Sequence, residues 1–140
     1  MKFELATPNR MLVSTDVEEV VAPGVEGYFG VLPGHAPLLT TLGSGEVTYR
    51  SGRTEHHLLV AGGFAEVQPD RVIILAEVAE APEEIDLARA ERARQRAELR
   101  LSGRHPQGHE AEGEIDFDRA LAALARALAR IMVAGRIRTA

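Results

Sequence analysis

Acidic and basic side chains in the C-terminal half of the chain are spaced so that helices would bring them onto common faces. Arg89 and Arg96 follow Asp86 by three and ten residues, which places all three along one stripe of a helix. Arg126 and Arg130 are four residues apart and share one face of a second helix. Because guanidinium groups bind phosphate through paired hydrogen bonds, this set predicts a site for a phosphate-bearing ligand. The alternative is a set of ion pairs on solvated helix faces, each worth about 0.3 kcal/mol.

The other reactive side chains form no pattern that supports catalysis. The chain has no Gly-x-x-x-x-Gly-Lys-Ser/Thr loop and no Gly-x-Gly-x-x-Gly after a strand, which argues against nucleotide hydrolysis by this chain alone. His105 and His109 have the spacing of a helical metal pair, but Pro106 and Gly108 lie between them and indicate a solvated loop. No serine lies in a Gly-x-Ser-x-Gly turn. We therefore expect a non-catalytic protein with no metal and no required cofactor.

Composition favours a small protein without disulfides. A chain of 140 residues suits one domain, or a small sandwich with a helical appendix. The absence of cysteine excludes a disulfide framework and favours an intracellular setting. No apolar run approaches the roughly 18 residues that span a bilayer, so we expect membrane association only through a partner. The lack of tryptophan and the net charge of -5 argue against a nucleic-acid partner.

Charge is unevenly distributed along the chain. Residues 1–82 hold 5 Lys/Arg and 11 Asp/Glu, whereas residues 83–140 hold 11 and 10. Beyond Asp118 there is no acidic residue, and the arginines there are Arg119, Arg126, Arg130, Arg136 and Arg138. A basic tail on an acidic protein predicts docking on an acidic protein patch or on phosphate, with a solvated helix face as the alternative.

The first 81 residues predict a β-sandwich or barrel. Short runs rich in Val, Leu, Phe and Thr alternate with turn signals. Over residues 45–50 the alternation places Val47 and Tyr49 on a core face, and Glu46, Thr48 and Arg50 on a face toward solvent or a partner.

Two glycine-containing segments lie within this region. Residues 26–39 combine glycine and proline without a cluster of acids, bases or thiols, which predicts a rigid surface rather than a reactive site. Gly62 and Gly63 are expected to form a turn, and Phe64 is expected to enter the core.

Residues 82–140 predict a helical hairpin. The first helix is expected from Pro82 to Leu101, and residues 102–113 hold three glycines and a proline that predict a mobile connection. The second helix is expected from an N-cap at Asp116 to a stop at Gly135, with an apolar stripe of Phe117, Leu121, Leu124, Leu128 and Ile131. The first helix offers mainly alanines. Burial of an alanine side chain stabilises a contact by about 0.8 kcal/mol, compared with roughly 2 kcal/mol for leucine. We therefore expect the first helix to pack weakly on the second, as a conformational switch requires.

Three segments of the chain resemble the epsilon subunit of bacterial F-type rotary ATP synthases. They are Glu26-Gly27 with residues 30–38, then residues 62–67, then residues 85–90, in the order and spacing of that family. The resemblance covers nearly the whole chain. It implies a flattened β-sandwich over residues 1–81 and an antiparallel two-helix hairpin over residues 82–140, with a linker at about 102–113.

The resemblance also implies a function. It implies a non-catalytic subunit of the central stalk of a proton-translocating ATP synthase, peripheral at the cytoplasmic face of the bacterial plasma membrane. The sandwich would join the gamma subunit to the c subunits of the rotor ring. The helices would inhibit ATP hydrolysis by docking on the alpha/beta catalytic head through Arg119, Arg126, Arg130, Arg136 and Arg138.

Individual residues match the motifs of the family. The loop that faces gamma and the ring matches Gly30, Val31, Leu32, Pro33, Gly34, His35, Ala36, Pro37 and Leu38, although Tyr28 stands where relatives often carry an acid. For His35 the alternative is a turn histidine satisfied by backbone. A regulatory ATP would be held by Glu80, Ile85, Asp86, Arg89, Ala90, Arg96, Arg126 and Arg130. A stand-alone ATP-binding sensor, with a sandwich and a helical lid, is the second hypothesis.

Overall fold

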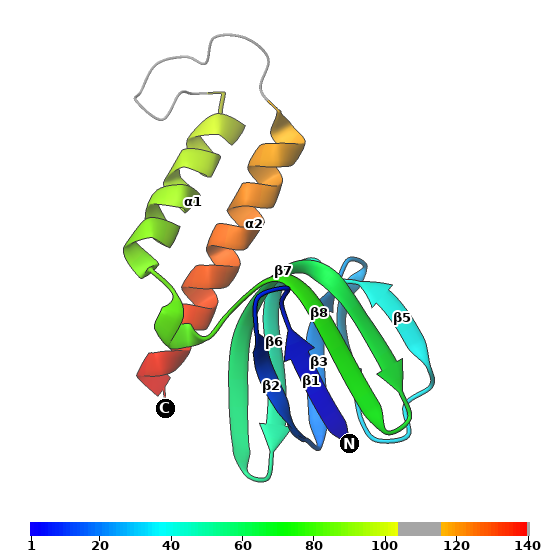
Figure 1. Cartoon of the computed structure of the whole chain (residues 1–140). Coiled ribbons are helices and arrows are strands. Elements are labelled where there is room, and N and C mark those ends of the chain that lie inside the picture. Colours follow the sequence, from blue (N-terminus) through cyan, green and yellow to red (C-terminus); the bar gives the residue numbers. More distant parts are fainter. Residues whose placement is uncertain (104–115, 140) are drawn as a thin grey trace.

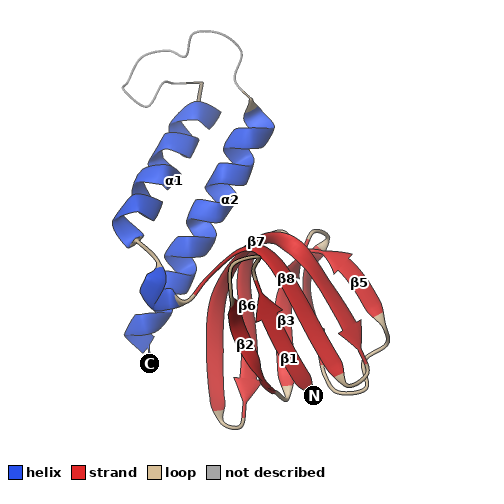
Figure 2. Cartoon of the chain, viewed as in Figure 1, coloured by secondary structure: helices blue, strands red, loops and turns tan. Residues whose placement is uncertain are grey.

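The computed structural model describes residues 1–103 and 116–139, without the side chains of residues 138 and 139. Within these ranges a β domain is followed by a helical pair (Figures 1 and 2). The strands are β1 (Lys2–Ala6), β2 (Met11–Asp16), β3 (Glu19–Gly24), β4 (Gly27–Val31), β5 (Leu38–Thr41), β6 (Ser44–Ser51), β7 (Thr54–Gln68) and β8 (Arg71–Glu80). The helices are η1 (Pro82–Glu84), α1 (Leu87–Leu101), α2 (Phe117–Ala134) and η2 (Gly135–Thr139).

The strands form one continuous sheet that folds over itself into a sandwich (Figure 2). Their order is β2-β1-β8-β7-β6-β3-β4, with β5 paired to β7. All pairs are antiparallel except β1 with β8. Apolar side chains from both layers, among them Phe3, Leu5, Val31, Val47 and Ile74, are fully buried between them. The predicted sandwich followed by two helices is confirmed.

The alternation predicted for β6 is correct on the core face and incomplete on the other. Val47 is fully buried, and Tyr49 packs against the same core. Glu46, on the opposite face, is also buried, because α2 packs over β6 and β7 and covers that part of the sheet. The partner predicted for this face is therefore, at Glu46, the chain's own C-terminal helix.

The turn predicted at Gly62-Gly63 is wrong. Strand β7 runs through both glycines, pairing with β6 before them and with β5 after them. Both residues have positive φ, 75° and 117°, and a side chain at Gly63 would lie 2.1 Å from the Leu75 carbonyl oxygen. The glycines therefore let one strand bend from one layer into the other. Phe64, which was expected in the core, is exposed, because it lies on the outer face of β7.

The first helix begins later than predicted. Pro82 opens the short helix η1, the chain is extended at Ile85, and α1 starts at Leu87 with Asp86 as its N-cap. The side chain of Asp86 accepts a hydrogen bond from the Arg89 N–H at 3.0 Å. An aspartate at the N-cap stabilises a helix more than it does inside the first turn, which explains the later start.

The face of α2 that contacts α1 is lined by alanines rather than by the larger side chains of the predicted stripe. The two helices lie side by side, with α2 between α1 and the sandwich (Figure 1). Ala120 and Ala127 of α2 are buried, as are Ala90 and Ala97 of α1. In contrast, Phe117, Leu121 and Leu128 of the predicted stripe are about half exposed. Periodicity identified the apolar stripe correctly, but the alanine face makes the contact, because small side chains permit close approach of the helices.

The connection expected at residues 102–113 lies outside the described residues except for Ser102 and Gly103, and His105 and His109 fall there too. Gly103 ends α1 in the left-handed region, with φ 80°.

Candidate functional site

A cleft of about 440 Å³ opens between α1 and α2 above the end of β8. Its volume is within the range of small-ligand sites. Among the described residues, its walls consist of acids, arginines and alanines: Glu80, Glu84, Asp86, Arg89, Ala90, Ala93, Arg96, Ala123, Arg126, Ala127 and Arg130. The structure therefore brings together every residue predicted for ATP except Ile85.

The α1 wall of the cleft contributes both acidic and basic side chains. Asp86 is held in place because its Oδ1 atom caps the helix, while Arg89 and Arg96 follow along the same side of α1. Between them, Ala90 and Ala93 leave room in the cleft because their side chains are short. Ile85, by contrast, packs against Leu59, Ala129 and Val133 below the cleft and does not line it.

The α2 wall contributes two arginines. The Arg130 Nε atom donates to Glu80 Oε1 at 2.8 Å, and both side chains are 29% exposed. Arg126 lines the same cleft and also an adjoining hollow beside Glu77. No ion pair involving Arg126 occurs among the contacts of the described residues, so its guanidinium group is available to an anion. Together the walls surround the cleft with the four arginines Arg89, Arg96, Arg126 and Arg130 and with the carboxylates of Glu80, Glu84 and Asp86.

A second ion pair holds the floor of the cleft, and the sequence analysis missed it. The Arg10 Nη2 atom, which comes from the turn before β2, lies 2.7 Å from Glu84 Oε2. Glu84 also accepts the Ala81 N–H at 2.9 Å. The hydrogen bond from Arg10 lowers the pKa of Glu84, and the bond from Ala81 lowers this pKa further. No sequence signal connects Arg10 with Glu84, because they are far apart in the chain.

The lowered pKa of Glu84 leads to a pH-dependent contribution to stability. A carboxylate with a depressed folded-state pKa stabilises the fold above its unfolded pKa, and this contribution is lost as the pH falls through the folded-state pKa. We expect Glu84→Gln to lower the free energy of unfolding near neutral pH, with the difference from the parent chain vanishing in acid. Urea unfolding of both chains between about pH 7 and pH 3 measures this. Glu83→Gln removes the same charge from the exposed neighbour, and an identical pH profile for both variants would contradict the role of the Arg10 contact.

The predicted interface loop lies at the opposite end of the sandwich from η1. Gly30 and Val31 end β4, and Leu38 begins β5. Gly34, with φ 86°, donates its N–H to the Pro69 carbonyl at 2.7 Å, which anchors the loop. Leu32 is exposed, whereas Val31 is fully buried and so belongs to the core rather than to a contact surface. The side chain of His35 lies 2.6 Å from its neighbour's carbonyl, Nδ1 to Ala36 O, as the turn hypothesis expects.

An exposed apolar face continues from this loop across β5, β7 and β8. Phe64 of β7 is paired with Leu75 of β8, and Leu39 of β5 lies on the same face through its pairing with Glu66. Leu39, Phe64 and Leu75 are 74%, 56% and 58% exposed. A cluster of this kind is typical of a protein interaction surface. The sequence analysis missed it because the predicted loop ended at Leu38 and Phe64 was assigned to the core.

The arginines predicted to dock on the catalytic head occupy different positions. Arg126 and Arg130 line the cleft, Arg119 is exposed near the start of α2, and Arg136 binds Glu46 of β6. The side chain of Arg138 lies outside the described residues. Docking on the head stays a prediction.

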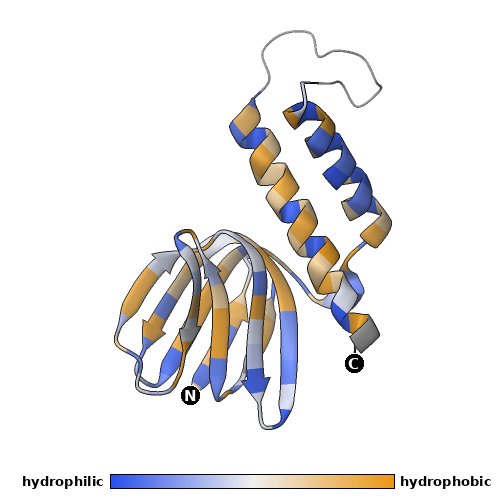
Figure 3. Ribbon diagram, turned by 180° about the vertical axis from the view of Figure 1, so that it is seen from behind, coloured by the Kyte–Doolittle hydropathy of each residue, from blue (hydrophilic) through white to orange (hydrophobic). Residues whose placement is uncertain are grey.

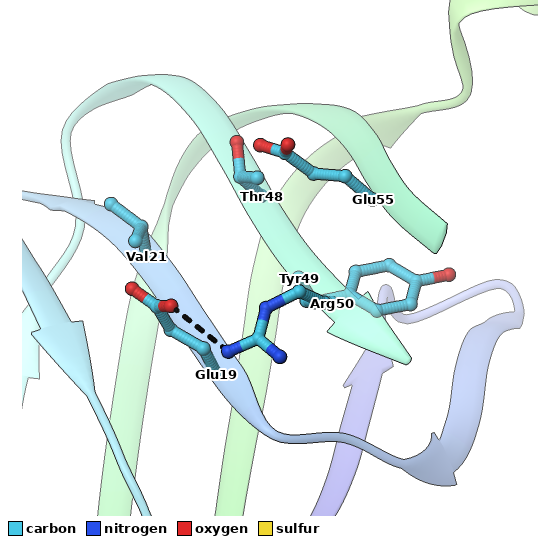
Figure 4. A pocket seen from close by; sticks show the side chains of 6 residues that line it. All are labelled: Glu19, Val21, Thr48, Tyr49, Arg50 and Glu55. Atoms are coloured by element: carbon cyan, nitrogen blue, oxygen red, sulfur yellow. Dashed lines mark hydrogen bonds and ion pairs between the residues drawn. The ribbon is translucent and has the colours of Figure 1, made fainter. Parts of the chain in front are cut away.

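A separate pocket of about 120 Å³ lies on the sheet (Figure 4). It is lined by Glu19, Val21, Thr48, Tyr49, Arg50 and Glu55, and the Arg50 Nη2 atom contacts Glu19 Oε2 at 3.4 Å. Its volume is below that of typical ligand sites, so it is not a comparable candidate. In the described ranges, 1–103 and 116–139, no group of three or more His, Asp or Glu side chains is placed to hold a metal ion. No helix in the part of the chain that the structure describes is long and apolar enough to cross a membrane.

Known proteins match this chain in both sequence and fold. The family model described as the β-sandwich domain of the ATP synthase delta/epsilon chain matches residues 1–82, and that of the long α-helix domain matches residues 83–135. The ATP synthase epsilon chain of Moorella thermoacetica is 49% identical over 138 residues, 98% of each chain. That of Syntrophobacter fumaroxidans is 49% identical over 96% of this chain and 95% of its own.

Solved structures agree on the fold. A chain of the Euglena gracilis mitochondrial ATP synthase OSCP/F1/c-ring structure aligns with a TM-score of 0.75 at 23% identity, covering 90% of this chain and 76% of its own. Because both domain models and relatives of nearly equal length match, the chain belongs to the epsilon chain family of F-type ATP synthases and is a non-catalytic subunit of that complex.

Proposed function

We propose that this subunit connects the gamma subunit to the c subunits of the rotor ring through its sandwich, at the cytoplasmic face of the membrane. The rigid loop before β5 and the exposed apolar face of Leu39, Phe64 and Leu75 support this contact, because they form one continuous surface away from the helices. Membership of the family favours this role over that of a stand-alone sensor. Contact with the membrane is through these partners only.

The helical pair is proposed to inhibit ATP hydrolysis when it leaves the sandwich and docks on the alpha/beta catalytic head. The contact between the helices is made largely by alanines, which bury little apolar area and so separate at modest cost. Helix α2 carries more hydrophobic residues than α1 (Figure 3), and three of its larger apolar side chains, Phe117, Leu121 and Leu128, are about half exposed in the docked arrangement. These half-exposed side chains are available to pack against the surface of another protein when the helices leave the sandwich.

ATP is proposed to act as the regulatory ligand of the cleft, and the observation that carries this proposal is the sharing of one cleft by α1 and α2. A ligand that contacts both walls stabilises the docked arrangement by its binding free energy. The triphosphate would bind the arginines of the cleft, with Arg130 released from Glu80, and the base would lie near Asp86. The described lining residues include no hydroxyl side chain and no histidine, and their acids and arginines are suited to binding a charged ligand.

Replacing one cleft arginine tests this proposal. Arg126→Ala removes the guanidinium group that faces the cleft without breaking an ion pair of the described residues. We expect the dissociation constant for ATP, measured by titration calorimetry on the full chain, to rise about tenfold or more, since a charge-assisted hydrogen bond contributes about 1.5–3 kcal/mol.

Arg92→Ala is the matched control, because Arg92 is an exposed arginine of α1 outside the cleft. It should leave the affinity unchanged. Equal affinity of Arg126→Ala and Arg92→Ala would exclude Arg126 from the site, and no heat of binding for the parent chain would refute ATP as the ligand.

A further inference from the structure

A charged side chain is buried on the face of the sheet that carries α2. Glu46 of β6 is the charged residue among the buried positions of the described ranges, with 7% of its side chain exposed. Burying a carboxylate is costly unless it is paired and hydrogen-bonded. The groups that pair with this carboxylate therefore show which part of the chain binds the sheet at this position.

The partner of Glu46 comes from the far end of the chain. Arg136 of η2 donates from Nε to Glu46 Oε2 at 2.8 Å and from Nη2 to Oε1 at 2.7 Å. This two-pronged geometry is the strong form of an arginine–carboxylate contact. Accordingly, the hydrogen bonds to Glu46 raise the pKa of Arg136. The Glu46 Oε2 atom also lies 3.3 Å from the Nδ1 atom of His57 on the neighbouring strand β7, so a side chain of the sheet contacts the carboxylate as well.

The ion pair lies beside the apolar attachment of α2 to the sandwich. Val133, one turn before Arg136, is fully buried, and it packs with Ala129 against Leu59 of β7 and Ile85. Neither Glu46 nor Arg136 lines the cleft between the helices. The attachment at the C-terminal end of α2 is thus spatially distinct from the residues proposed to bind nucleotide.

We infer that the Arg136–Glu46 pair is a latch that holds the C-terminal end of α2 on the sheet independently of any ligand in the cleft. An empty cleft then does not release the helices by itself, since the latch and the Val133 contact persist. Release also requires Glu46 to exchange the guanidinium group for water, which sets the population of free helices. The inference concerns the docked state of the isolated chain, and it stands whether or not the cleft binds ATP.

Amide hydrogen exchange on the full, nucleotide-free chain measures this latch. The amides of residues 131–134 report release of α2, because an isolated helix of this length is marginal in water. Glu46→Gln alters a residue of the sheet and leaves the sequence of α2 unchanged. Faster exchange in α2 of this variant therefore reports loss of the Arg136–Glu46 contact. We expect exchange of these amides to rise about tenfold or more in both Glu46→Gln and Arg136→Gln.

Controls and a double variant decide the outcome. Glu26→Gln and Arg92→Gln remove one exposed charge of each sign and should leave exchange in residues 131–134 within about twofold of the parent chain. The double variant Glu46→Gln/Arg136→Gln should accelerate exchange by less than the product of the two single effects, because both changes remove the shared Arg136–Glu46 contact.

Three results would overturn the latch. The first is exchange in α2 equal to that of the controls. The second is a double variant whose acceleration is the product of the two single effects. The third is an equal acceleration at Leu5 and Ile74 in the sandwich core, which would show a loss of overall stability instead of local release. If Glu46→Gln does not fold, Arg136→Gln against Arg92→Gln gives the same decision, because Arg136 lies outside the core.

Discussion

Removal of residues 103–140 is expected to raise ATP hydrolysis by the assembled synthase about fivefold or more, in the range of regulatory couplings between sites. The truncation deletes α2 and all five arginines beyond Asp118, and these carry the proposed docking on the catalytic head. The sandwich keeps its core, because its buried cluster contains no residue of α2. Hydrolysis by the purified complex, compared at equal subunit content, measures the effect. Unchanged hydrolysis with complete assembly would refute inhibition by the helices.

A milder change separates inhibition from folding. Leu121→Ser combined with Leu128→Ser alters two side chains of α2 that are 53% and 48% exposed in the docked arrangement. If this face meets the catalytic head, the double variant should also raise hydrolysis, while urea unfolding of the isolated chain stays close to that of the parent. A large loss of stability in the isolated chain would show that these leucines are already packed.

Among the substitutions considered, Gly63→Ala is expected to lower the free energy of unfolding most, by on the order of 4 kcal/mol. The added Cβ would lie 2.1 Å from the Leu75 carbonyl oxygen and 2.7 Å from the Ala76 Cα atom, and both are backbone atoms that cannot rotate away. In addition, φ at Gly63 is 117°, a conformation that strains any residue with a side chain. The midpoint of urea unfolding should therefore fall strongly.

Gly30→Ala is the control for this substitution. Gly30 lies in β4, its φ is not positive, and nothing lies within 4 Å of a Cβ added there. Its effect should be below about 1 kcal/mol, as for most exposed positions. Similar midpoints for Gly63→Ala and Gly30→Ala would show that β7 can straighten at the glycines.

The residue pattern predicted the fold class, whereas the motif resemblance indicated the residues of the site, of which all but Ile85 line the cleft. The Asp86 Oδ1 atom caps α1, and Arg126 and Arg130, four residues apart on α2, line the cleft together. The motif resemblance then related the two helices to each other. Ile85 was misplaced because a short extended segment interrupts the helical period at that residue.

The errors arose where a tertiary contact decides the outcome. Helix α2 has both an alanine face and a leucine face, and periodicity does not show which of them meets α1. Likewise, a Gly-Gly pair is compatible with a turn or with a bent strand, and only the pairing of β7 with both β5 and β6 distinguishes these. Glu46 was assigned to a face toward solvent or a partner, and the sequence did not identify the partner because Arg136 is 90 residues away.

The length of β7 has a mechanical consequence. Within this strand, Phe64 lies on the exposed apolar face, and Leu59, five residues earlier, lies beneath α2. A force applied at Phe64 is therefore transmitted along the covalent backbone of β7 to Leu59, which packs against Ala129 and Val133 of α2. No non-covalent interface lies between these two positions of the strand. In the proposed role, in which this face contacts the rotating partners, the bent strand would transmit their rotation to the helices.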